Sequence, residues 1–252
     1  MIVVASGEGP TDIGICNAFR NYCAGDLLAL GPFALLIDDI VEAEIFYSPI
    51  DNESFYVVSR SYLSQKWKQK KRGSIRFPGF KSQKGSVYFE YNARALSIVA
   101  TEIVESLTSQ GEAPPRVIAI LYRDSDGSNS SPKGEWQTKY DSIVRGFAQE
   151  KFPHGVAMLA KPIGESWLIS GCLQLNASQA IALEARSPNS KAAVPLKGQL
   201  ENEIEARYPH HTMSSTESMV ALINDQHVTL SNILTPSFMK FLTDLRAVLA
   251  TI

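Results

Sequence analysis

Two short apolar runs constrain the fold of this chain more than any other feature. Ile2–Ser6 and Val117–Tyr122 are almost continuously apolar, with no alternation between apolar and polar residues. A strand of this kind has both of its faces covered, which is typical of the centre of a parallel sheet with helices on each side. The two runs therefore predict an α/β fold with a parallel sheet flanked by helices.

Each of these predicted strands is followed by an acidic turn. The first turn reads GEGPTD over residues 7–12, and the second reads RDSDG over residues 123–127. In open parallel sheets, binding and catalytic sites lie at the carboxyl ends of the strands. If the two strands are neighbours, four carboxylates converge at one edge of the sheet: Glu8, Asp12, Asp124 and Asp126.

Carboxylates at close range favour a divalent cation. They repel one another and raise each other's pKa unless a cation lies between them. Their hard oxygen atoms suit Mg²⁺ or Mn²⁺, and such an ion can activate water for attack on a phosphate. Each turn taken alone also has a structural explanation, because aspartates in turns cap the backbone and GEGPTD is an ordinary helix start.

The order of these elements resembles the TOPRIM fold, in which a glutamate in a Gly-rich turn follows the first strand and a later strand ends in DxD. The segments GEGPTD and YRDSDG are similar to the OLD-nuclease branch of TOPRIM-like proteins. A third segment, PIGESWL over residues 162–168, resembles the Glu-Trp element of that group. The resemblance covers residues 1–26 and about 90–175.

The resemblance implies a Mg²⁺-dependent nuclease. Glu8 would be a metal ligand or a general acid/base, and Asp124 and Asp126 would hold the metal. Asp12 and Glu165 would be supporting carboxylates, although Asp12 also fits an N-cap and Glu165 a first-turn glutamate. The same resemblance implies a role in phage defence beside an ATPase partner.

A basic stretch follows in the first third of the chain. Between Ser54 and Phe89 there is no acidic residue, and aromatic residues alternate with lysines and arginines. Such a stretch can bind the phosphate backbone of DNA or RNA and stack on its bases; the alternative is a solvated charged face. The candidate nucleic-acid-binding residues are Arg60, Lys66, Lys68, Lys70, Lys71, Arg72 and Arg76.

Two more basic residues flank the second acidic turn. Lys133 lies in the polar loop that follows the turn and is a candidate catalytic residue that would contact the scissile phosphate. Arg123 lies directly before Asp124 and either contacts the same phosphate or pairs structurally with the carboxylates.

The remaining pattern predicts a single domain with two additions, an inserted basic lobe over residues 27–89 and a helical C-terminal extension over residues 174–252. Periodic apolar spacing predicts most helices, and a short apolar run predicts one more strand at Val156–Ala160. The predicted helices are Ile13–Cys23, Tyr91–Gln110 with Gly111 as C-cap, Trp136–Glu150, Ile163–Leu173, Gln199–Tyr208, Ser214–Asn224 and Pro236–Ala250.

Composition excludes several classes of protein. The 252 residues carry a formal net charge of −2 and are 44% hydrophobic, which excludes a disordered chain and a uniformly basic nucleic-acid coat. The three cysteines (Cys16, Cys23 and Cys172) form no CxxC pair, which favours a reducing compartment without a disulfide framework. Since no signal peptide or membrane-length apolar run occurs, we expect a cytoplasmic protein with no membrane partner, either alone or as a homo-oligomer.

Two other functions fit the same sequence. One is a non-catalytic TOPRIM-like subunit of a defence or repair complex, which would not need Glu8 to converge with Asp124 and Asp126. The other is a metal-dependent phosphatase acting on small molecules. An open groove with basic walls would favour the nuclease, and a small closed pocket would favour the phosphatase.

Overall fold

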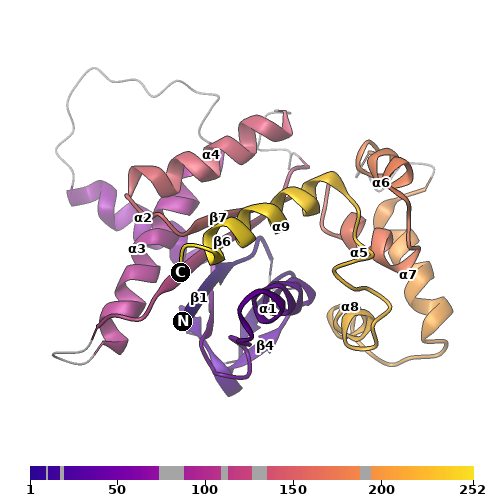
Figure 1. The fold of residues 1–252 in the computed structure, drawn as a ribbon, viewed down its shortest axis with the longest axis horizontal. Coiled ribbons are helices and arrows are strands. Elements are labelled where there is room, and N and C mark those ends of the chain that lie inside the picture. The colour runs from indigo at the N-terminus through magenta and orange to yellow at the C-terminus, as the bar shows by residue number, and fades with distance from the viewer. Residues whose placement is uncertain (10, 18–19, 74–87, 109–112, 127–134, 188–193) are drawn as a thin grey trace.

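The structure is a computed structural model, and it describes residues 1–9, 11–17, 20–73, 88–108, 113–126, 135–187 and 194–252 (Figure 1). Within these residues, no helix is both long enough and apolar enough to cross a membrane. The strands are β1 (Ile2–Ser6), β2 (Gly14–Cys16), β3 (Tyr22–Cys23), β4 (Leu28–Leu30), β5 (Phe55–Val58), β6 (Val117–Asp124) and β7 (Gly155–Ala160). The α-helices are α1 (Pro32–Ile45), α2 (Arg60–Gly73), α3 (Glu90–Leu107), α4 (Trp136–Gln149), α5 (Glu165–Cys172), α6 (Ala177–Glu184), α7 (Leu196–Arg207), α8 (Ser215–Asn224) and α9 (Pro236–Leu249).

The main sheet has five strands in the order β3-β5-β1-β6-β7. β1 pairs in parallel with β5 and β6, β6 pairs in parallel with β7, and the edge strand β3 is antiparallel to β5. The predicted α/β class is therefore confirmed, with a mixed, mostly parallel sheet. β1 and β6 are neighbours, and Ser6 lies opposite Leu121, so the turns after both strands lie at the same edge.

Helices cover both faces of this sheet, which explains why its central strands are continuously apolar. On β1, Val3 and Ala5 belong to the core beneath α1, α5 and α9, whereas Ile2 and Val4 belong to the core beneath α3 and α4. In Figure 1 the two helical layers lie on opposite sides of the sheet, with α9 crossing in front of β6 and β7.

The C-terminal third is helical, as predicted, and its last helix is part of the core. Trp167 of α5 is fully buried and packs against Phe238 and Phe241 of α9 at centroid distances of 5.4 and 6.2 Å. Its indole Nε1 donates a hydrogen bond of 2.8 Å to Ser237 Oγ. These contacts fix α9, and with it the end of the chain, against the α5 side of the sheet.

The helix predicted over Ile13–Cys23 is wrong. The described residues of this segment instead form two short strands, β2, which pairs with the later strand β4 in an antiparallel ribbon, and β3, which pairs with β5. Gly14 has a φ of 141°, and a Cβ at this position would lie 2.5 Å from the Ala29 carbonyl oxygen. A helix is excluded because this backbone conformation and the close approach of the partner strand both require glycine at this position.

The cysteine spacing did not indicate a disulfide, but the structure holds one. Cys16 and Cys23 form a disulfide that joins the β2–β4 ribbon to the edge strand of the main sheet, and Cys172 is a buried free thiol. The sequence did not reveal the pair, because the spacing of Cys16 and Cys23 does not indicate that β2 and β3 lie next to each other.

The inserted lobe is much smaller than residues 27–89. β5 is an interior strand of the main sheet and α1 covers one of its faces, so residues 32–58 are part of the sheet architecture. Of the described part of the basic stretch, only α2 lies outside the sheet, and it packs on α3. Residues 74–87 lie outside the described residues.

Most other predicted elements are confirmed to within a few residues. These are the strands β1, β6 and β7 and the helices α3, α4, α5, α7, α8 and α9. The predicted C-cap Gly111 lies outside the described residues. The sequence did not single out α6, which has a capping box of Asn176 and Gln179.

Candidate acidic site at the carboxyl edge of the sheet

Glu8 and Asp124 meet where β1 and β6 end. The backbone N–H of Asp124 donates to Glu8 Oε2 at 3.3 Å, so the two turns predicted to converge do so at this edge. The other oxygen of Glu8, Oε1, lies 3.3 Å from Nη1 of Arg60, the first residue of α2. Glu8 therefore connects the end of β6 to the start of the basic helix.

The two carboxylate oxygens of Asp124 differ in their partners among the described residues. Its Oδ1 accepts hydrogen bonds from the Tyr122 hydroxyl at 2.7 Å and from the Gly164 backbone N–H at 2.9 Å. A Cβ on Gly164 would lie 2.2 Å from the Tyr122 hydroxyl oxygen, so glycine is required for the start of α5 to approach this close. Oδ2 makes no hydrogen bond with any residue that the structure describes.

The carboxylates around Asp124 influence its protonation. Burial raises the pKa of Asp124 well above its ordinary value, and the Tyr122 hydroxyl opposes this by hydrogen bonding to the ionised form. The negative charges of Glu165, Asp12 and Asp126 raise the pKa of Asp124 further. Such mutual repulsion would be relieved by a cation.

Asp126 lies between acidic and basic side chains. Burial raises its pKa, and Glu8 raises it further, whereas Lys139 and Lys197 lower it. Its backbone N–H donates to the Pro162 carbonyl at 2.9 Å, which fixes the turn beyond β6 against the segment before α5. Asp126 is half-buried, so its carboxylate is accessible from solvent.

Asp12 closes the first turn and does not cap a helix. Its Oδ2 accepts a 2.6 Å hydrogen bond from the Gly9 backbone N–H, and its carbonyl accepts one from Phe33 at the start of α1. Burial raises the pKa of Asp12, and the charges of Glu165 and Glu8 add to this effect. Asp12 is thus both a turn residue and a member of the acidic edge.

Glu165 is the first residue of α5, as expected of a first-turn glutamate. Its Oε1 lies 3.6 Å from Nζ of the exposed Lys197 at the start of α7. Its charge also raises the pKa of Asp12 and Asp124. Across the described part of the chain, no three His, Cys, Asp or Glu side chains are grouped closely enough to form a complete metal site.

Arg123 holds the first turn from inside the protein. It is fully buried, and its Nη1 donates to the carbonyls of Gly7 at 2.8 Å and Tyr122 at 2.6 Å. With the Asn92 amide turned to present its oxygen, that oxygen accepts a 2.8 Å hydrogen bond from Nη2. Burial lowers the pKa of Arg123 to about 10. Because Arg123 is fully buried, it does not reach a phosphate in this structure. Its role is structural, since it holds the turn that carries Glu8 through the Gly7 carbonyl.

Lys139 is a site residue that sequence reasoning missed. It is 1% exposed on α4, and its Nζ donates a 2.7 Å hydrogen bond to the Ser125 carbonyl. Burial lowers the pKa of Lys139, while Asp126 and Glu8 oppose this shift. The signal was available, because Lys139 lies on the apolar stripe of its helix, three residues after Trp136 and four before Ile143.

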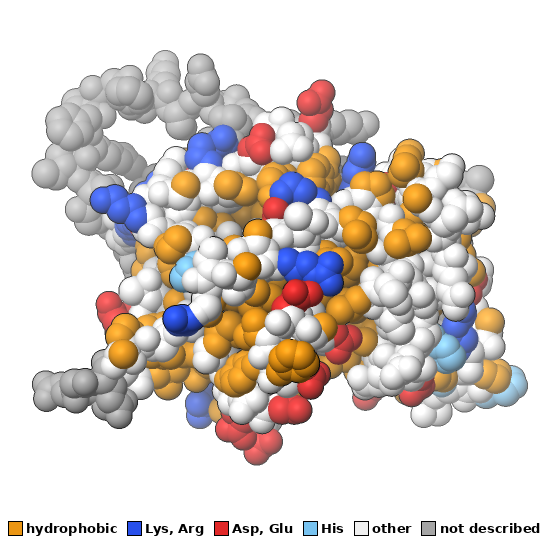
Figure 2. Space-filling model, in the orientation of Figure 1, with side chains coloured by type: hydrophobic (Ala, Val, Ile, Leu, Met, Phe, Trp, Pro, Cys, Tyr) orange, Lys and Arg blue, Asp and Glu red, His pale blue; other side chains and the backbone are white. Residues whose placement is uncertain are grey.

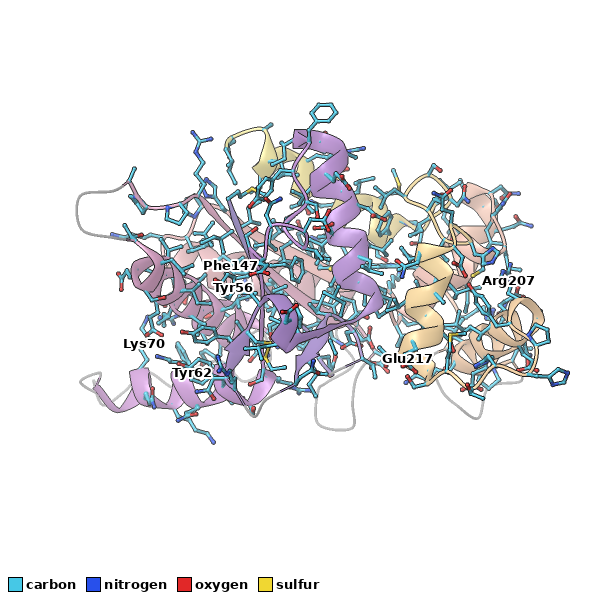
Figure 3. All side chains as sticks on the ribbon, turned by 90° about the horizontal axis from the view of Figure 1, so that it is seen from below. Tyr56, Tyr62, Lys70, Phe147, Arg207 and Glu217 are labelled. Carbon is cyan, nitrogen blue, oxygen red and sulfur yellow. A yellow bond between two sulfur atoms is a disulfide. The ribbon has the colours of Figure 1, made fainter. Side chains whose placement is uncertain are left out.

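Most of the basic side chains that the structure describes on α2 pair with acids from elsewhere in the chain. Three of the predicted nucleic-acid-binding residues form ion pairs: Arg60 with Glu8, Lys66 with Glu102, and Lys70 with Glu150. Lys68 is exposed. Figure 3 labels Tyr62 and Lys70 on α2. On the face of the molecule drawn in Figure 2, lysines and arginines are scattered and form no continuous stripe. Arg76 and Lys133 lie outside the described residues, as do the side chains of Lys71 and Arg72.

A cavity of about 470 Å³ adjoins the acidic edge. It lies between the turn after β1, the strand β2 and the start of α2, and its lining includes Glu8, Arg20 and Arg60. Comparison with protein-family models, curated proteins and solved structures finds no match for this chain.

Proposed function

We propose that this chain is a TOPRIM-like nuclease that uses Mg²⁺ or Mn²⁺ to hydrolyse phosphodiester bonds in DNA or RNA. The observation that supports this most directly is the contact between Glu8 and the end of β6, which carries Asp124 and, two residues later, Asp126. Sites in parallel sheets lie at this edge. The resemblance of GEGPTD and YRDSDG to OLD-type nucleases supports the same proposal.

The donor set fits a magnesium ion better than zinc. Mg²⁺ is usually bound by one or two carboxylates, and water and substrate phosphates complete its shell, so a group of three protein ligands is not required. Asp124 offers its available Oδ2, and Asp126 offers a half-buried carboxylate two residues later. We propose these two as the residues that hold the metal, with Glu8, Asp12 and Glu165 around them.

The chain's own residues would do the remaining work. A bound divalent ion would supply an activated water and stabilise charge on the phosphate. Glu8 would accept a proton from that water. The Glu8 carboxylate is held in place by Arg60 and by the backbone N–H of Asp124. Arg123 and Lys139 are positioning residues, because each holds a turn through backbone carbonyls.

Cleavage of labelled DNA and RNA in Mg²⁺ or Mn²⁺ tests the proposal. We expect Glu8→Gln and Asp126→Asn each to lower the initial rate by more than about 100-fold. The first variant loses the proposed proton acceptor, and the second loses a proposed metal ligand. Glu105→Gln is the matched control, an exposed glutamate on α3 whose loss should leave the rate unchanged. Cleavage that persists unchanged in both site variants would contradict the assignment.

The cavity beside Glu8 favours a second candidate, a metal-dependent phosphatase acting on small molecules. Its volume of about 470 Å³ is that of a small-molecule site. Hydrolysis of p-nitrophenyl phosphate but not of bis(p-nitrophenyl) phosphate would indicate the phosphatase, and the reverse preference would indicate the nuclease. No hydrolysis of either, with folded protein, would indicate the non-catalytic subunit.

The biological setting is part of the proposal. A nuclease of this type would act in the cytoplasm, in phage defence, beside an ATPase partner or as a homo-oligomer. The Cys16–Cys23 disulfide is the feature that a reducing compartment would alter. Thiol titration of protein purified under reducing and non-reducing conditions would show which form is present.

A further inference from the structure

We infer that the cavity beside Glu8 binds an unpaired nucleotide, so that the substrate of the proposed nuclease is single-stranded nucleic acid or a frayed end. This inference rests on the proposed function, because the nucleotide would be held next to the phosphodiester that the acidic edge cleaves. It names a binding site formed by the turn after β1, the strand β2 and the first turn of α2.

The cavity has the size and lining of a nucleotide site. Its volume of about 470 Å³ lies within the range of small-molecule pockets, which combine apolar walls with a few polar groups. Ile15, Val57 and Val58 supply apolar surface, and one half of the disulfide, Cys16, lies in the same wall. Tyr22, next to Cys23 in β3, packs against Tyr62 of α2 with ring centroids 6.3 Å apart, and Figure 3 labels Tyr62 on this helix.

Two arginines bring positive charge to the cavity, whose lining also includes Glu8. Arg20 is exposed and forms no hydrogen bond or ion pair with any other described residue, so its guanidinium is available to a ligand. Arg60 lies on the other wall, where it also pairs with Glu8. A guanidinium can contact a phosphate or stack on a base, and both are common in recognition of single strands.

The start of α2 adds further groups that suit a phosphate. Ser59, Arg60 and Ser61 all line the cavity, so the amino end of a 14-residue helix faces it. The Ser59 hydroxyl accepts from the Tyr62 N–H at 3.3 Å, and it lies 3.1 Å from the Ser61 hydroxyl. Backbone N–H groups at such an end favour negative charge.

The position of the cavity selects an unpaired strand. Gly7, Glu8 and Gly9 line it, so a ligand inside contacts the same turn that carries the proposed proton acceptor. A base that enters a recess of this kind must leave its duplex partner, whereas a paired base stays stacked in the helix. We therefore expect single strands to bind in preference to duplexes.

Binding measured without divalent metal separates this inference from cleavage. Fluorescence anisotropy in EDTA would compare a labelled 12-nucleotide single strand with a blunt duplex of the same sequence, and unlabelled mononucleotide and inorganic phosphate would compete. We expect the single strand to bind more tightly, Arg20→Gln to weaken its binding by about 10-fold, and mononucleotide to displace it better than phosphate does.

Matched variants control for charge and for folding. Arg116→Gln removes the same charge from an exposed arginine at the opposite edge of the sheet and should leave binding unchanged. Ser61→Trp would obstruct the cavity, whereas Ser64→Trp, at an exposed position one turn along α2, should not.

Three results would overturn the inference: equal affinity for duplex and single strand, unchanged binding in both Arg20→Gln and Ser61→Trp, or displacement by phosphate as effective as by mononucleotide. The last would show a simple anion site. If single-strand binding follows the expectation and no metal supports cleavage, the proposed nuclease fails while the nucleotide site stands.

Discussion

Asp38 is buried and Asp124 is half-buried, and the two aspartates differ in how many of their carboxylate oxygens accept hydrogen bonds. Asp38, on α1, has both oxygens occupied, since Ser48 Oγ donates to Oδ2 and the Ile50 N–H to Oδ1, each at 2.8 Å. Asp124 has only Oδ1 occupied within the described residues and shares its edge with other carboxylates. Burial raises the pKa of both.

The difference shows how a structural carboxylate can be told from a candidate ligand. Asp38 fixes the loop between α1 and β5, where donors to both of its oxygens offset its burial, although the charges of Asp51 and Glu42 raise its pKa. Asp124 has one oxygen, Oδ2, that accepts no hydrogen bond from the described residues, and it lies among carboxylates whose mutual repulsion a cation would relieve. Burial alone does not distinguish them, whereas the partners of each oxygen do.

The largest expected contrast is in catalysis. Asp124→Asn should lower the cleavage rate by more than about 100-fold, because the spare ligand oxygen is replaced by an amide. Asp38→Asn should stay within about twofold of the parent, since it lies away from the acidic edge. Initial rates on one labelled substrate would measure both, and equal losses would remove the distinction.

Stability should show the reverse contrast. Asp38→Ala leaves two donors unpaired and should lower the free energy of unfolding by about 2 kcal/mol. Asp124→Asn retains an acceptor for Tyr122 and Gly164 and removes a buried charge, so we expect it to raise the free energy of unfolding at pH 8. Urea titrations would measure both changes; a destabilised Asp124→Asn would show that its charge is compensated within the chain.

Metal binding should appear as stabilisation at the acidic edge. A ligand at ten times its Kd adds about 1.4 kcal/mol to the free energy of unfolding. We expect Mg²⁺ to stabilise the parent and Asp38→Asn but not Asp124→Asn. The effect should weaken as the pH falls, because the raised pKa of Asp124 means that protons compete with the metal.

The smallest expected effect concerns the residue beside Asp38. Burial, with the charges of Asp38 and Glu42, raises the pKa of Asp39 from 3.8 to about 6. A raised carboxyl pKa means that stability is lost as pH rises through the folded value. Asp39→Asn should therefore match the parent near pH 4 and exceed its free energy of unfolding by about 1 kcal/mol at pH 7, after allowance for partial exposure. Thermal denaturation across this pH range would test it.

The sequence predicted the meeting of the two acidic turns better than the surroundings of the basic stretch. The two apolar strands placed Glu8 and Asp124 at one edge because parallel neighbours end together, and the structure pairs β1 with β6. The basic stretch was less predictable, because its partners Glu102 and Glu150 lie far away in the chain and only tertiary packing brings them to α2. The role of Lys139 depends in the same way on a carbonyl from another element.

By itself, the sequence determined the class of the fold and the edge that carries the carboxylates. Local patterns suffice for these, since apolar runs and acidic turns are read within a few residues. Tertiary structure alone decided that β2 pairs with β4 and is joined to β3 by the Cys16–Cys23 disulfide. It also decided that β5 enters the sheet beside β1 and that Arg123 faces inward. The place of β5 and the inward orientation of Arg123 depend on contacts between segments distant in sequence, whereas the ribbon and the disulfide depend on a close approach of nearby segments that no apolar or acidic pattern indicates.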